Sequence, residues 1–186
     1  MLKEKEQVAQ WIGEMAFSDS QIALKSLYQY YFERLLRFVS THGPSYIEAE
    51  EIVSDTFLAL WNNRKTLLSV NNPDAYIFTV TRNKTISYLR SQQYNQIRLD
   101  EFPVDFFACT ETTPEDALIS KEEINQLNDA INTLPHRSKM VFKLIREDKM
   151  KYKDVATILD ISVKTVETHI GIAIRKLREI LSKQKK

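Results

Sequence analysis

Residues that interrupt regular structure are scarce in this sequence. Only three glycines and five prolines occur among 186 residues, and no segment alternates apolar and polar residues in the way of a half-buried strand. Long stretches instead repeat apolar residues at intervals of three and four, as amphipathic helices do. The sequence therefore predicts an all-α protein, and its length suggests one or two small domains.

Cysteine and long apolar runs are also nearly missing. Cys109 is the one cysteine, which excludes an internal disulfide and a zinc site built from several cysteines. No apolar run approaches the roughly 20 residues that span a bilayer, and the polar start MLKEKEQ is not typical of a signal peptide. We therefore expect a cytoplasmic protein that does not itself insert into a membrane.

The side-chain groupings that enzymes need are absent as well. His42, His136 and His169 have no spacing suited to a metal, and there is no glycine-rich phosphate loop. Cys109 lies in an acidic stretch that should not stabilise a thiolate. We expect neither catalytic activity nor a cofactor or metal.

Charge is distributed unevenly, although the net charge is only +1. Residues 1–95 carry ten basic and ten acidic side chains, residues 96–135 carry two and nine, and residues 136–186 carry fourteen and six. A basic C-terminal third joined through an acidic segment indicates a polyanionic partner for that third.

The stretch from Lys151 to Leu177 lies in this basic third and has the pattern of a helix-turn-helix. The apolar faces of its two helices are formed by Val155, Ala156, Ile158 and Leu159, and by Val166, Ile170, Ala173 and Leu177. Between them Ile161 can fill the angle between the helices, and Ser162 can cap the second one. Polar residues near the start of that helix point away from its apolar face, where a recognition helix meets base edges in the major groove. The alternative is a solvated face on any small helical hairpin; the turn chemistry and the basic surroundings favour DNA binding.

The first half of the chain contains further helix signals. Residues 1–20 predict a short helix or a loosely held arm. A helix follows from Ser20 until His42-Gly43-Pro44. A second starts at the capping box of Ser45 and Glu48 and runs to about Trp61, and a third starts at Asn72-Pro73-Asp74.

The third of these helices mixes two kinds of residue. We expect Ile77, Val80, Ile86 and Leu89 to pack inward. Basic, amide and aromatic side chains lie between them, a mixture that suits phosphate contact and stacking on unpaired bases. An ordinary surface helix is the alternative, and the helix taken alone favours it. Trp61, likewise taken alone, is more typical of a core residue than of an exposed anchor.

Helical periodicity fails after Tyr94, where acids, threonines and prolines accumulate, and it returns at Thr113-Pro114. The intervening residues predict an acidic linker. Further helices are expected up to Leu134-Pro135 and from about Val141 to Asp148. With the helix-turn-helix they form a four-helix C-terminal domain.

These motifs, in this order, resemble the extracytoplasmic-function (ECF) sigma factors, the smallest members of the main bacterial sigma family. SLYQYYFERLLRFV is similar to the opening of region two, EAEEIVSDTFLALW to the helix that binds core polymerase, and NPDAYIFTVTRNKTISYLR to the promoter-melting helix. INTLPHRSKMVFKLI and KYKDVATILDISVKTVETHIGIAIRKLRE are similar to region four. The resemblance implies a sigma factor that binds core RNA polymerase and directs promoter-specific initiation. Its implied domains are an arm or short helix at 1–20, region two at 21–95, a linker at 96–113 and region four at 114–186.

The resemblance also implies roles for residues of region two. The helix bearing Asp55, Leu58 and Trp61 would bind the β′ clamp coiled coil of the polymerase, which makes Trp61 an exposed anchor. The loop from Arg64 to Asn72 and the helix around Asn83 would capture and melt the minus-ten element, with Asn83 contacting a flipped base. The implied minus-ten residues are Arg82, Asn83, Lys84, Ser87, Tyr88 and Arg90.

Region four would read the minus-thirty-five element as duplex DNA, with Arg175 near the backbone. The implied residues are Ser162, Lys164, Thr165, Glu167, Thr168 and Arg175. The β flap tip would dock against the hydrophobic side of region four, and the family makes a membrane-tethered anti-sigma factor a plausible further partner. Asp160 stands where many helix-turn-helix units have glycine, which aspartate can replace in a left-handed turn. His169 is expected to pack with its neighbours and not to touch DNA, and Ser87 replaces a frequent aspartate or asparagine.

The segment KDVATILDISVKTVETH also resembles the DNA-binding domain of LuxR-type regulators. That alternative needs a receiver or ligand domain upstream, with strands that end in paired acids. Residues 1–95 predict helices only, so the sigma-factor interpretation is favoured.

Overall fold

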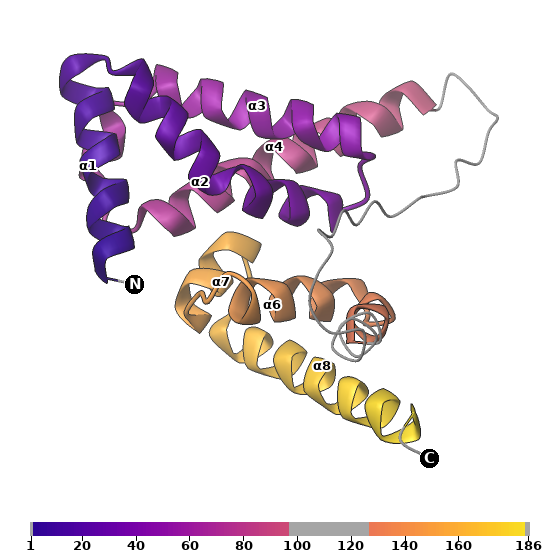
Figure 1. The fold of residues 1–186 in the computed structure, drawn as a ribbon. Coiled ribbons are helices and arrows are strands. Elements are labelled where there is room, and N and C mark those ends of the chain that lie inside the picture. Colours follow the sequence, from indigo (N-terminus) through magenta and orange to yellow (C-terminus); the bar gives the residue numbers. More distant parts are fainter. Residues whose placement is uncertain (1, 97–126, 185–186) are drawn as a thin grey trace, which may run out of the picture. The chain divides into compact units, whose positions relative to one another are not determined.

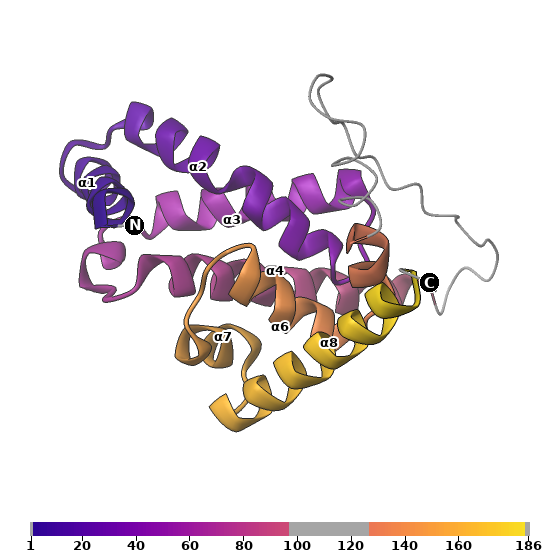
Figure 2. The same cartoon turned by 60° about the horizontal axis from the view of Figure 1, so that its bottom comes forward.

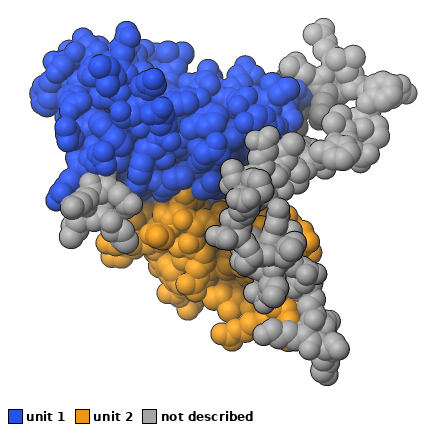
Figure 3. Space-filling model, viewed as in Figure 1, with its two compact units in different colours: residues 1–100, 157–160 blue, residues 101–156, 161–186 orange. Residues whose placement is uncertain are grey.

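The structure, a computed structural model, describes residues 2–96 and 127–184. The regular elements of these residues are helices, as the all-α prediction requires, and no strand occurs among them (Figure 1). The chain divides into two compact units, which Figure 3 colours separately. Figure 3 colours residues 157–160 like the first unit. Helix α7, however, runs unbroken from Tyr152 to Leu159, so residues 157–159 continue a helix of the second unit. No helix of the described residues is long and apolar enough to cross a membrane.

The first unit contains α1 (Leu2–Ser18), α2 (Gln21–Ser40), α3 (Tyr46–Asn62), the short 3₁₀ helix η1 (Thr66–Ser69) and α4 (Pro73–Gln96). Helix α3 packs against both α2 and α4, and α2 also contacts α4. Helix α1 crosses the end of this bundle, where it packs on α2 and η1; Figure 1 shows it from the side and Figure 2 nearly along its axis.

The helices of the first unit begin where their capping residues predict. Ser45 Oγ accepts a hydrogen bond from Glu48 N, and the Glu48 carboxylate accepts one from Ser45 N at 2.7 Å, which completes the capping box of α3. Asn72 Oδ1 accepts from Ala75 N at the start of α4. Helix α2 stops at Ser40, before Gly43 takes a φ of 111°.

Helix α1 is an integral part of the first unit. Its inward face, formed by Val8, Ile12, Met15 and Ala16, is buried. Burial of side chains as large as Val8, Ile12 and Met15 contributes about 1.5–3 kcal/mol each. Of the two alternatives for residues 1–20, the structure therefore shows the helix and not the loosely held arm.

The buried side chains of α4 differ from those that the sequence predicted. Ile77 is buried as expected, but Val80, Ile86 and Leu89 are only half-buried. Phe78, Thr81 and Thr85 are fully buried in their place. The two threonines can lie inside because each hydroxyl donates to the carbonyl four residues earlier, at 2.9 and 2.8 Å.

The second unit contains a helical segment at 127–132, α6 (His136–Arg146), α7 (Tyr152–Leu159) and α8 (Val163–Gln184). Helix α6 packs along α8. A core cluster joins the helical segment to α8 and consists of Ala130, Ile131, Leu134, Ala173 and Leu177, with Phe142 and Ile180 against it. The predicted linker from residue 97 onward and the expected helix start at Thr113-Pro114 lie outside the described residues.

Candidate nucleic-acid interface

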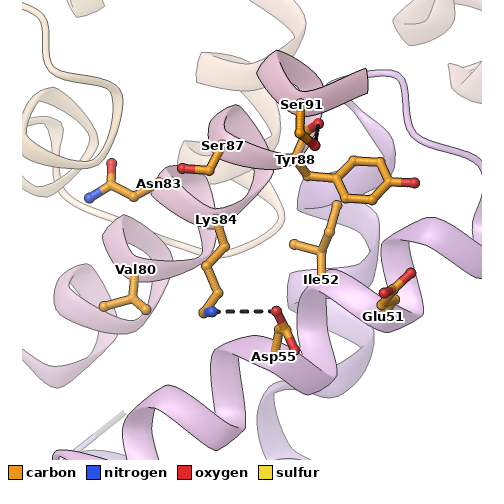
Figure 4. A pocket seen from close by; sticks show the side chains of 9 residues that line it. All are labelled: Glu51, Ile52, Asp55, Val80, Asn83, Lys84, Ser87, Tyr88 and Ser91. Carbon is orange, nitrogen blue, oxygen red and sulfur yellow. Dashed lines mark hydrogen bonds and ion pairs between the residues drawn. The ribbon is translucent and has the colours of Figure 1, made fainter. Parts of the chain in front are cut away.

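An open groove of about 490 Å³ lies between α3 and α4 in the first unit (Figure 4). Most of its lining comes from one face of α4, at intervals of three and four residues. The residues that line it are Glu51, Ile52, Asp55, Val80, Asn83, Lys84, Ser87, Tyr88 and Ser91. Four of the six side chains predicted to bind the minus-ten element thus share one surface.

Asn83 and Ser87 are exposed on the α4 side of this groove, whereas Lys84 reaches across it (Figure 4). Lys84 Nζ lies 3.5 Å from Asp55 Oδ2 on α3. This ion pair joins a predicted promoter residue to a predicted polymerase residue. Within the described residues the Asn83 amide has no hydrogen-bond partner, so both its donor and its acceptor are available.

Tyr88 is held more firmly than the sequence suggested. Its hydroxyl donates to Glu48 Oε1 at 2.7 Å and accepts from Gln92 Nε2 at 2.8 Å. Burial raises the pKa of Tyr88, and the hydrogen bonds from Ser45 and Tyr88 lower the pKa of Glu48. The hydroxyl is therefore occupied within the protein, and the ring is what remains for stacking.

The remaining minus-ten residues lie apart from the groove lining. Arg82 is half-buried, and Arg90 is exposed on the C-terminal half of α4. Neither residue contributes to the surface of the groove itself.

The outer face of α3 carries the three predicted polymerase residues. Asp55 is exposed, and Leu58 is 58% exposed. Trp61 is half-buried, and the guanidinium of Arg64 lies over its ring, with Cζ 4.7 Å from the ring centroid. Arg64 was not anticipated in this role, and its partner Asp19 lies 45 positions away in sequence.

In the second unit, the turn of the helix-turn-helix has the geometry that its residues predict. Asp160 takes a left-handed φ of 55°, and Ile161 N donates to Ala156 O at 3.0 Å, which closes the end of α7 as in a Schellman motif. Ser162 Oγ accepts from Thr165 N at 3.0 Å and caps α8. The eight predicted apolar residues of α7 and α8 are all buried.

The polar side of α8 faces solvent. Lys164 has a side chain that is 86% exposed and pairs with Glu167 at 3.1 Å. Thr168 and Arg175 are exposed, and Thr165 is half-buried beside Ser162, with a hydrogen bond of 2.8 Å between the two hydroxyls. Five of the six predicted residues are thus accessible along one helix and its cap.

His169 is half-buried and contacts a neighbouring helix, which confirms the expected packing of its ring. Its Nδ1 forms a hydrogen bond of 3.2 Å with Ser138 Oγ of α6, and Ser138 is buried. Ser138 gave no sequence signal, because a single serine in a helix is ordinarily a surface residue. The bond helps to fix α8 against α6. Among the described residues, no group of His, Cys, Asp or Glu could hold a metal ion.

Comparison with known proteins supports both halves of this picture. The family model for sigma-70 region 2 matches residues 27–94, and the model for sigma-70 region 4 matches residues 124–177. The ECF RNA polymerase sigma factor RpoE of Cereibacter sphaeroides is 22% identical over 97% of this chain and 100% of its own length. The RNA polymerase sigma factor CnrH of Cupriavidus metallidurans is 26% identical over 91% of this chain and 92% of its own.

Solved structures share the fold. CnrH in complex with the cytosolic domain of CnrY aligns with a TM-score of 0.61 and 21% identity over 95% of this chain and 97% of that one. The sigma factor RpoE of Bartonella quintana, in complex with the anti-sigma factor NepR, aligns with a TM-score of 0.67 and 21% identity over 85% and 96%.

The two matched regions and the exposed helix-turn-helix define a sigma factor of the sigma-70 type, a class of polymerase subunits that are not enzymes. The chain belongs to the ECF group of the sigma-70 family. It binds core RNA polymerase and promoter DNA and directs promoter-specific transcription initiation. The LuxR-type alternative has no support, because the N-terminal half matches sigma region 2.

Proposed function

We propose that residues 21–95 bind core polymerase and open the minus-ten element, that residues 96–113 are a linker, and that residues 114–186 bind the minus-thirty-five element. The family matches at 27–94 and 124–177 fall inside the two proposed regions. We further propose that the protein acts in the cytoplasm, where core polymerase works, and has no catalytic activity of its own.

The outer face of α3 is the proposed polymerase surface. Asp55, Leu58 and Trp61 follow one another at intervals of three, so they share one side of the helix. Leu58 and Trp61 offer apolar surface on this side, and tryptophan is one of the residues enriched at interface centres. The β′ clamp coiled coil would cover these two side chains, with Asp55 at the charged edge.

The groove beside α4 is the proposed minus-ten surface, and the exposed Asn83 amide at its edge is the observation that carries this assignment. An amide that lacks an internal partner can pair with the edge of an unstacked base. The Tyr88 ring offers a face for stacking. Arg82, Lys84 and Arg90 would contact phosphates, and Lys84 would exchange Asp55 for a phosphate when it does so.

Helix α8 is the proposed minus-thirty-five surface. Its exposed N-terminal turns would enter the major groove, with Lys164, Thr165, Glu167 and Thr168 near base edges. Arg175 would contact the backbone. The hydroxyl of Ser162 is occupied as a cap, so its contribution would be to position the helix start.

Two further partners complete the proposal. The β flap tip would bind the apolar side of region four. Solved relatives are bound to the anti-sigma factor NepR and to the cytosolic domain of CnrY, and we propose that a membrane-tethered anti-sigma factor likewise binds this chain.

The test is Asn83→Ala in the full chain, assayed with core RNA polymerase. We expect open-complex formation, followed by permanganate reactivity of unpaired thymines, to fall about tenfold, because a lost base contact costs ~1–3 kcal/mol. Core binding, measured by competition with a labelled sigma factor, should not change. Asn132→Ala, which removes an exposed amide from the second unit, is the matched control.

Loss of core binding by Asn83→Ala, with the fold preserved, would show that the faces of α3 and α4 have been assigned wrongly. Specific dimeric operator binding in the absence of polymerase would contradict the proposed division of labour altogether.

A further inference from the structure

Helix α1 lies outside the family match, which begins at residue 27, yet it contacts the loop proposed to capture the minus-ten element. That loop runs from Arg64 to Asn72 and contains η1. Among the described helices, α1 makes the most extensive contact with η1. Leu67 of η1 is buried, whereas Leu68 is 46% exposed. The loop therefore has one anchored side and one accessible side.

The first residue of this loop is fixed by three contacts. Arg64 Nε donates to Asp19 Oδ1 at 2.6 Å, and Arg64 Nη1 donates to Trp61 O at 3.0 Å. The guanidinium also lies over the Trp61 ring, with Cζ 4.7 Å from its centroid. Arg64 thus connects the end of α1, the end of α3 and the start of the loop.

Asp19 is itself held in a defined position. It follows the last residue of α1 and takes a left-handed φ of 49°, and Ser20 N donates back to Glu14 O at 3.4 Å. Aspartate tolerates this conformation better than most residues. The bond from Arg64 lowers the pKa of Asp19, so its carboxylate is charged at neutral pH.

We propose that Asp19 is a positioning residue for minus-ten recognition, which fixes the start of the 64–72 loop through Arg64. Helix α1 then influences promoter selectivity without a DNA contact of its own. The inference rests on the proposed function of this loop. It adds Asp19, which lies before the residues matched by the family model, to the residues proposed to act in minus-ten recognition.

Asp19→Asn in the full chain tests the inference, because asparagine keeps the shape and the left-handed tolerance of aspartate but removes its charge. We expect transcription from a library randomised through the minus-ten element to show weaker base preference, with discrimination reduced about threefold, the scale of one exposed charge pair. Core binding and the unfolding midpoint should stay at their wild-type values. Glu14→Gln removes a nearby carboxylate of α1 that bonds Gln10 and not the loop, and it should change nothing.

A double-mutant cycle shows whether Asp19 acts through Arg64. In an Arg64→Gln background, Asp19→Asn should have little further effect, since the shared contact is already gone. An additive effect, a uniform loss of transcription with unchanged base preference, or no effect would each overturn the inference.

The Leu68→Ala variant distinguishes failure of this inference from failure of the proposed function on which it rests. If Leu68→Ala leaves the minus-ten preference intact, the loop does not read that element and the proposed function of the loop fails. If Leu68→Ala shifts the preference while Asp19→Asn does not, the loop assignment stands and only the role of Asp19 is lost.

Discussion

In the first unit the polar side chains of the proposed interface hold partners far away in sequence, whereas in the helix-turn-helix they bond within one turn. Lys84, Tyr88 and Arg64 reach partners 29, 40 and 45 positions away. Ser162, Lys164 and Thr168 bond to residues three or four positions away. The surface of the first unit is therefore set by how its helices pack, and that of the second is set mainly by local turn and helix chemistry.

The largest expected effect comes from removing a core side chain of one unit at a time. Phe78→Ala should lower the free energy of unfolding of the first unit by about 3–5 kcal/mol, because the ring is fully buried and packs edge-on against Phe38. Ile158→Ala should cost the second unit about 2–5 kcal/mol. Both tryptophans, Trp11 and Trp61, lie in the first unit, so urea titration followed by their fluorescence should respond to Phe78→Ala alone.

Circular dichroism of the same samples should respond to both variants. A tryptophan fluorescence midpoint that shifted equally with Ile158→Ala would show that the two units unfold as one. The proposed contrast would then be wrong, namely that helix packing sets the interface of the first unit and local turn and helix chemistry sets that of the second.

A smaller effect is expected from the turn of the helix-turn-helix. Asp160→Val should destabilise the second unit by about 1–2 kcal/mol, because a β-branched side chain is strained at a φ of 55°. Asp160→Gly should match or slightly exceed wild-type stability, since glycine adopts this conformation freely. Thermal unfolding followed by circular dichroism measures both; equal stability of the two variants would mean that the turn conformation is not the constraint.

The smallest effect is a pH-dependent one at the start of α3. The bonds from Ser45 and Tyr88 lower the pKa of Glu48 below its ordinary 4.5, so the stabilisation is present above that value and is lost as the pH falls through the folded-state pKa. Glu48→Gln keeps the capping-box geometry but removes the charge. It should cost about 0.5 kcal/mol at neutral pH.

Urea midpoints of wild type and Glu48→Gln should therefore differ at about pH 7 and converge as the pH falls below the ordinary glutamate pKa and through the lowered folded-state pKa. A difference that persisted in acid would assign the effect to the shape of the side chain and not to its charge. In that case the link between Glu48 and Tyr88 would be steric.

Local signals predicted the boundaries of the helices well. The capping box at Ser45, the Asn72 cap and the left-handed Asp160 all depend on residues within a few positions of each other, and the structure confirms each of them. Inward faces were predicted less well. In α4, Val80, Ile86 and Leu89 were expected to pack inward but are only half-buried, whereas Thr81 and Thr85 are fully buried.

The site residues were predicted from motif order, but the contacts that these side chains make could not be predicted in that way. Nothing local indicates that Lys84 meets Asp55, that Tyr88 meets the capping Glu48, or that His169 meets Ser138. These pairs join different helices, and helical periodicity specifies which face of a helix is apolar without specifying which helix lies against it.

The sequence by itself determined the all-helical architecture, the helix starts, the turn of the helix-turn-helix and the family, because these depend on short spacings and their order along the chain. Only the tertiary structure decided that α1 belongs to the first unit, that Arg64 lies between Asp19 and Trp61, and that the Asn83 amide faces solvent beside a groove. The physical reason is that packing brings together residues whose separation in sequence leaves no periodic trace.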